Sequence, residues 1–149
     1  MEELSLRILD LRSPLVYTQT QTSPPDNHEN YTGQEELLFC YELDPAQSSA
    51  LEPERGRLLA ALAFIGCGAK NGNGGKTVSL PAGTYLFAQR RQALGKNEWL
   101  DIAVEQQKEC LKNELRKQYE PQPRLYVRYL FEDRSPVTQL FRPVKNLQM

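Results

Sequence analysis

TVSLPAGTYLF, residues 77–87, is the stretch that predicts how this chain folds. Its two halves have the composition of short strands, and the Pro-Ala-Gly at 81–83 between them is typical of a tight turn. A mixed polar and apolar segment over 98–119 follows and predicts a helix. Alternating runs at 124–131 and 136–143 then predict two more strands. We therefore expect a strand, helix, strand, strand unit after the hairpin's first strand.

The helix is predicted from an apolar stripe on one side. Residues of this stripe recur at helical spacing, namely Leu100, Val104, Leu111 and Leu115. Asn97 has a side chain suited to an N-cap, and Pro121 and Pro123 stop a helix. We expect this helix to cover one face of an antiparallel sheet and to leave the other face open.

Strands are also predicted upstream, at residues 4–11, 15–22 and 35–43. The run at 58–66 is ambiguous, because its alanines and leucines favour helix while its length and Gly-rich exit favour a buried strand, which we prefer. Asn-Gly pairs within 68–76 predict a hairpin loop, and the polar, Pro-containing segment 22–34 predicts an exposed loop. The fold class expected is α+β.

Composition limits the classes of function. The 149 residues are of ordinary globular composition, with 40% hydrophobic residues and a net charge of −1, and we expect them to form one domain. No basic field favours nucleic acid, and no apolar run is long enough to cross a membrane. Without the features of a secretory signal at its start, we expect the chain in the cytoplasm.

Catalytic and metal chemistry are not favoured by the residues present. The single histidine, His28, lies in the polar loop, where a nucleophile pair would have to be built around it. The cysteines are Cys40, Cys67 and Cys110, which lack the close spacing of zinc ligands or of a disulfide framework. We therefore expect no catalytic residue, no metal and no cofactor.

Three motifs in order carry a resemblance to a known family: LPAGTYLF at 80–87, LYVRYL at 125–130 and VTQLFRPV at 137–144. Residues 76–145 resemble the GyrI-like (gyrase-inhibitory-protein-like) small-molecule-binding domains, which also form the effector domains of some MerR-type regulators. The resemblance implies two pseudo-repeated strand-helix-strand-strand units around a ligand groove. The second repeat would be 76–145, and 4–66 would be a degenerate first repeat whose helix is short or missing.

The resemblance also implies a ligand-binding residue, and this sequence departs from the family at that position. Many relatives carry a glutamate two residues before the tyrosine of the penultimate strand, where it meets cationic ligands. Val127 stands at that position before Tyr129, so recognition of cationic drugs does not carry over. Glu42 or Glu132 could supply a carboxylate instead.

The function expected first is sequestering or sensing of flat, apolar or aromatic small molecules between the repeats, because aromatic walls bury such guests. The candidate ligand-binding residues are Tyr17, Tyr41, Glu42, Tyr85, Phe87, Trp99, Val127 and Tyr129. Each could equally be a core residue, since alternation turns about half of the aromatics toward the helix. A protein-binding inhibitor or regulatory partner is the alternative, a hydrolase using a groove acid and tyrosines is a third class, and the oligomeric state stays open.

Overall fold

A computed structural model describes residues 7–21, 36–48, 53–70, 75–111 and 118–147. Within them the chain forms one antiparallel sheet of nine strands. The strands are β1 (Arg7–Leu11), β2 (Leu15–Thr20), β3 (Leu37–Leu43), β4 (Leu62–Ala69), β5 (Thr77–Leu80), β6 (Gly83–Arg90), β7 (Tyr119–Pro121), β8 (Arg124–Glu132) and β9 (Ser135–Asn146). The helices are α1 (Pro45–Ser48), α2 (Arg55–Ala61) and α3 (Lys96–Cys110).

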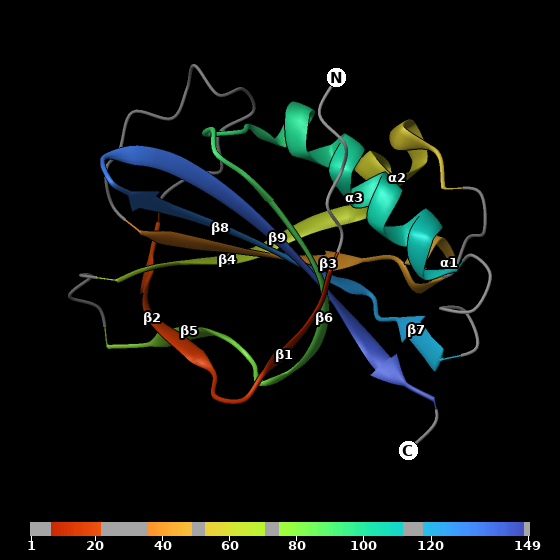
Figure 1. The fold of residues 1–149 in the computed structure, drawn as a ribbon, viewed down its shortest axis with the longest axis horizontal. Helices are drawn as coiled ribbons and strands as arrows, with labels where there is room; N and C mark the ends of the chain where they lie inside the picture. The colour runs from red at the N-terminus through yellow and green to blue at the C-terminus, as the bar shows by residue number, and fades with distance from the viewer. Residues whose placement is uncertain (1–6, 22–35, 49–52, 71–74, 112–117, 148–149) are drawn as a thin grey trace.

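The sheet is curled into a half-barrel. Its strand order is β1-β6-β9-β8-β3-β4-β2-β5, and β7 pairs with β9 beside this path. Residues 12–14 join β1, at one end of this order, to β2 near the other end, and residues 81–82 join β5 to β6. Because both links are short, the two ends of the sheet must approach each other, as Figure 1 shows where β1 meets β2 and β5 meets β6.

The convex side of the sheet is packed against helices, which Figure 1 shows gathered together at one side of the strands. Helix α3 contributes Trp99, Leu100, Ile102, Ala103 and Val104 to this core. The strands contribute alternate residues, which are Leu37, Phe39, Tyr41, Leu43, Cys67, Ala69, Ala88, Leu125, Val127, Tyr129 and Leu140. Alternate residues of β3 and β8 therefore build one wall of a conventional helix-on-strand core.

The concave side is packed by the intervening residues of β3, β6, β8 and β9, together with one residue each from β2 and β5. Its buried members are Tyr17, Leu38, Cys40, Leu80, Tyr85, Phe87, Tyr126 and Phe141. Aromatic rings meet here edge to face, with centroids 5.8 Å apart for Tyr85 and Phe141 and 5.1 Å apart for Phe87 and Phe141. The face expected to be open is thus largely filled by the protein's own aromatic side chains.

The antiparallel sheet with few helices is confirmed, although so much of the chain is strand that α+β describes it only loosely. The two pseudo-repeated units and the single-domain organisation stay predictions. Helix α3 begins at Lys96, and Gly95 rather than Asn97 is its N-cap. The Gly95 amide donates to Glu98 Oε1 at 3.1 Å, so a side chain one turn into the helix satisfies the helix start.

The ambiguous run 58–66 is half helix and half strand. Helix α2 ends at Ala61 and β4 begins at Leu62, so the prediction of strand throughout was wrong for 58–61. The change occurs where Leu62 reaches its partner Leu43 on β3, and sheet pairing there outweighs the helix propensity of alanine and leucine. The loop predicted at 22–34, residues 71–74 of the hairpin loop, and 112–117 of the predicted helix lie outside the described residues.

Candidate ligand cleft

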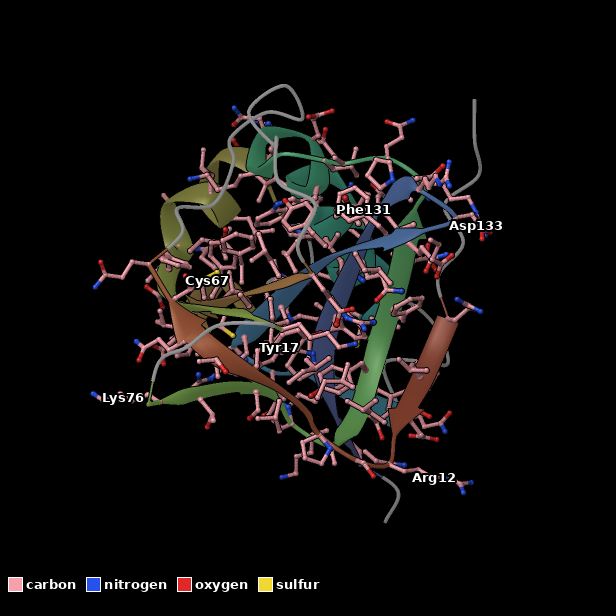
Figure 2. The ribbon with its side chains drawn as sticks, turned by 90° about the vertical axis from the view of Figure 1, so that its left-hand side faces the viewer. Arg12, Tyr17, Cys67, Lys76, Phe131 and Asp133 are labelled. Atoms are coloured by element: carbon pink, nitrogen blue, oxygen red, sulfur yellow. The ribbon has the colours of Figure 1, made fainter. Side chains whose placement is uncertain are left out.

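A cleft of about 310 Å³ remains on the concave side, between β1 and the strands β6, β8 and β9. It is lined by Arg7, Ile8, Leu9, Leu11, Leu15, Phe87, Gln89, Arg128, Gln139 and Phe141. Figure 2 looks into this side of the molecule, with β2 and β5 to the left, β1 and β6 to the right, and Tyr17 between them. The curl of the sheet explains the cleft. The short link at 12–14 holds β1 close to β2 at one point, and away from that link the two ends of the sheet stay apart.

One wall of the cleft is polar and is aligned by sheet register. Arg128 on β8 lies opposite Gln139 on β9, which lies opposite Gln89 on β6. Arg128 Nη1 donates to Gln139 Oε1 at 2.9 Å, and Gln139 Nε2 donates to Gln89 Oε1 at 2.8 Å. Three strands thereby place a continuous hydrogen-bonded row across the concave face.

Arg128 is held from behind by Glu36 and Tyr17. Its Nη2 donates to Glu36 Oε2 at 3.0 Å and its Nε to the Tyr17 hydroxyl at 2.8 Å, while that hydroxyl donates to the same Glu36 oxygen at 2.7 Å. The side chains of Arg128 and Glu36 are each 18% exposed, so the pair is only weakly screened by solvent. Every polar atom that fixes the arginine is therefore already in place before a ligand arrives.

The ionisation states of this network follow from its contacts. Burial alone would raise the pKa of Glu36, but hydrogen bonds from Tyr17 and Arg128 outweigh it and hold that pKa below its usual value. Burial, together with the hydrogen bond to Glu36, raises the pKa of Tyr17. At neutral pH the network is thus a carboxylate, a guanidinium and a neutral phenol.

The other walls are apolar apart from one cation. Leu9, Leu11 and Leu15 flank the cleft at its β1 and β2 side and pack against the concave core. The guanidinium carbon of Arg7 lies 5.0 Å from the centroid of the Phe87 ring, a cation–π distance. The cleft therefore combines an aliphatic and aromatic surface with two arginines.

A second hollow of about 350 Å³ lies near β5 and is bordered by Lys76, Arg124 and Cys40, among others. Its cations are less organised: Arg124 is 45% exposed and lies 3.9 Å from Glu42. Burial raises the pKa of Cys40 to about 11, so its thiol stays protonated. We take the first cleft as the candidate site because its charged wall is fixed by hydrogen bonds.

Three of the candidate residues from the sequence lie at or beside the cleft. Phe87 lines it, Tyr17 donates and accepts in the network behind it, and Tyr85 belongs to the same aromatic cluster. The structure does not bring the other five to the cleft. Tyr41, Trp99, Val127 and Tyr129 lie in the helix-covered core, and Glu42 is exposed beside Arg124.

The polar residues of the cleft were missed by sequence reasoning. Alternation already placed Arg128 between Tyr126 and Leu130 on the face away from Val127, and a cation among apolar neighbours was the available signal. Gln89, Gln139 and Arg7 carried no comparable signal, because only strand register brings them together. Glu132, the other carboxylate considered, lies 3.6 Å from Arg91 and does not line the cleft.

Other site chemistry is limited in the part of the chain that the structure describes. No group of three or more His, Cys, Asp or Glu side chains there could hold a metal ion. The described helices include none that is both long enough and apolar enough to cross a membrane. His28 lies outside the described residues. The geometry is that of a cleft with a preformed polar wall.

Comparison with known proteins does not assign this chain to a family. No protein-family model matches this sequence, and no curated protein is significantly similar to it. The resemblance of residues 76–145 to GyrI-like domains stays a prediction.

Proposed function

We propose that this protein binds a small molecule with an apolar body in the cleft between β1 and β8–β9, in order to sense or sequester it. One observation carries the proposal: this hollow in the concave core has an apolar wall opposite a hydrogen-bonded polar wall. Ligand sites commonly combine a mostly apolar lining with a few fixed polar groups. The flat aromatic guests expected from the sequence fit such a lining, although the aromatics that would contact them are Phe87 and Phe141.

The size of the cleft limits the guest. A volume of 310 Å³ corresponds to roughly ten water molecules at about 30 Å³ each. A guest of roughly ten non-hydrogen atoms would therefore fill it, and larger dyes would protrude. Phenylpropanol, phenylpropylammonium and phenylpropionate have this size, share one body and differ in charge.

Binding is tested by titrating all three compounds and following amide NMR shifts. We expect shifts from at least one compound that concentrate on β1, β6, β8 and β9. The substitution Leu9→Trp adds bulk to the cleft wall and should abolish them. Val16→Trp places the same side chain at a position that is 59% exposed and outside the lining, so it should leave them intact. Saturable shifts that survive Leu9→Trp, or no shifts with any compound, would overturn the proposal.

A protein partner is a second candidate, favoured by a different surface. Phe64 and Ile65 on β4 are 45% and 46% exposed. Within the described residues, β4 pairs with β2 only from Cys67 to Ala69, so its beginning is paired to β3 alone. Exposed apolar residues on a sheet edge suit the addition of a strand from another chain. Sedimentation at increasing concentration, with Phe64→Lys as the comparison, tests the simplest partner, a second copy.

We do not propose hydrolysis. Glu36 and Tyr17 are an acid and a tyrosine in contact, but the carboxylate already accepts from Tyr17 and Arg128. Its lowered pKa makes it a weak base, and the raised pKa of Tyr17 opposes formation of a phenolate.

A further inference from the structure

The hydrogen-bonded row across the cleft has a fixed direction. An arginine side chain can only donate, so Gln139 must turn its carbonyl oxygen toward Arg128. The amide nitrogen of Gln139 then faces Gln89 and donates to its Oε1. Gln89 is left with its Nε2 group at the end of the row. The orientations of both amides follow from the arginine, so they do not depend on distinguishing amide oxygen from nitrogen.

This direction leaves the cleft wall rich in donors. Arg128 uses three of its five N–H groups on Tyr17, Gln139 and Glu36, and its other two make no hydrogen bond within the described residues. The Nε2 group of Gln89 likewise makes none there. Each acceptor oxygen of the row already accepts one hydrogen bond, Gln139 Oε1 from Arg128 and Gln89 Oε1 from Gln139.

The charges at the cleft have one sign. Of the described residues that line it, only Arg7 and Arg128 are charged. Arg7 lies over the Phe87 ring and forms no ion pair within the described part of the chain. Glu36 compensates Arg128 and is not part of the lining. A guest entering the cleft therefore meets positive charge and unused N–H groups.

We propose that the guest is an anion, specifically a small monocarboxylate whose apolar body lies against Leu9, Leu15 and Phe141. Its carboxylate oxygens accept from Arg128 and Gln89, and Arg7 closes the site over the Phe87 ring. This assignment rests on the proposed function and specifies its ligand. Hydrogen bonds in which a partner is ionised are about twice as strong as neutral ones, so the carboxylate gains most from this wall. An ammonium group would instead be repelled by Arg7, which no described carboxylate compensates.

The matched compounds separate charge selection from binding as such. By calorimetry, we expect phenylpropionate to bind about tenfold more tightly than phenylpropanol, a difference of about 1.4 kcal/mol, and phenylpropylammonium to bind more weakly than either. Equal affinity for the acid and the alcohol, or tighter binding of the amine, would overturn the carboxylate assignment while leaving a cleft that binds small molecules. No binding by any of the three removes the proposed function itself.

A matched pair of variants locates the effect. In Gln89→Glu, the carboxylate still accepts from Gln139 Nε2, but it replaces the free donor with negative charge at the cleft. Phenylpropionate affinity should fall about tenfold or more, with phenylpropanol affinity changed less than about twofold. Gln92→Glu makes the same change in net charge at an exposed residue outside the lining and should change neither affinity. Equal losses in both variants would indicate a general charge effect and overturn the assignment.

A further variant does not depend on the buried row. Arg7 is exposed and takes no part in the hydrogen-bonded network, so Arg7→Gln should fold normally. It should weaken phenylpropionate selectively and leave phenylpropanol unaffected. Unchanged phenylpropionate affinity in a folded Arg7→Gln protein would remove Arg7 from the site, and unchanged affinity in both Arg7→Gln and Gln89→Glu would overturn the proposal.

Discussion

Each face of the sheet holds an arginine, which is buried on one face and partly exposed on the other. On the helix-covered face Arg142 is 1% exposed, and it donates to Gln107 Oε1 on α3 and to the Gln122 carbonyl, each at 2.9 Å. Burial lowers the pKa of Arg142 to about 10, so the side chain stays charged at neutral pH although it is shielded from solvent. On the concave face the Arg128 side chain keeps 18% of its surface exposed and is compensated by Glu36.

The difference between the faces comes from what covers them. Helix α3 packs over β6, β7 and β9, and its Trp99 reaches Tyr41 on β3, so polar groups beneath the helix are closed off. The concave face is covered only by the sheet's own curl, whose two ends meet imperfectly at β1. The face without a helix is therefore where a ligand can reach polar groups that are already positioned. Three experiments would break or sharpen this contrast.

The largest effect is expected from Trp99→Ala on the helix-covered face. Trp99 is 1% exposed and contacts Tyr41 with ring centroids 5.2 Å apart. Its removal leaves a cavity beneath α3 and should lower the free energy of unfolding by about 3–5 kcal/mol in urea. Val16→Ala, at a 59% exposed position, should stay within about 0.5 kcal/mol of the parent. A smaller loss for Trp99→Ala than for Phe87→Ala would mean that the concave face dominates stability.

A middle-sized effect is expected at Gly68, where β4 closely approaches β2 and β5. A Cβ there would lie 2.5 Å from the Cβ of Tyr17 and 3.2 Å from that of Val78. Gly68→Ala should therefore cost about 1–3 kcal/mol through overpacking, and it should displace Tyr17 from Arg128. Gly66→Ala is the matched control in the same strand, because no atom lies within 4 Å of its added Cβ. Equal denaturation midpoints for the two variants would contradict the close approach of β2 to β4.

The smallest effect is expected from Glu36→Gln, and it depends on pH. The folded-state pKa of Glu36 is lowered, so its contribution is complete above the ordinary value of 4.5 and is lost as the pH falls through the lower folded pKa. At neutral pH the variant should be less stable by about 1 kcal/mol, through weakened hydrogen bonds to a charged group. Urea titrations at about pH 7 and about pH 3 should show the difference shrinking on acidification. A difference that grows in acid would contradict the lowered pKa.

Much of the strand content was predictable because alternation is local. The faces of β8 follow directly from the spacing of Leu125, Val127 and Tyr129, and they appear as predicted. The end of α2 was not predictable, because the run 58–66 changes from helix to strand where Leu62 pairs with Leu43 on β3. The N-cap of α3 was not predicted because Gly95 has no side chain that would indicate a cap. The hydrogen bond to the Gly95 amide comes from Glu98 instead.

The cleft could not be predicted from the sequence, for a geometric reason. Alternation assigns a residue to a face, but it does not say which strands are neighbours or in what register. Arg128, Gln139 and Gln89 are separated in sequence by 11 and 50 residues and meet only because β8, β9 and β6 pair as they do. The aromatics that suggested a groove were divided by the same alternation, so Tyr41 and Tyr129 went to the helix side while Tyr17 and Phe87 went to the concave side.

The pairing of β1 with β6 has a kinetic consequence. Arg7 lies opposite Phe87, 80 residues away along the chain (87 − 7). Contacts between such distant segments must overcome a large entropic cost of loop closure before they stabilise anything, so the folding rate should lie toward the slow end known for sheet proteins. A guest held between β1 and β9 would bridge segments that lie far apart along the chain. Its main effect on the chain would then be slower unfolding rather than faster folding.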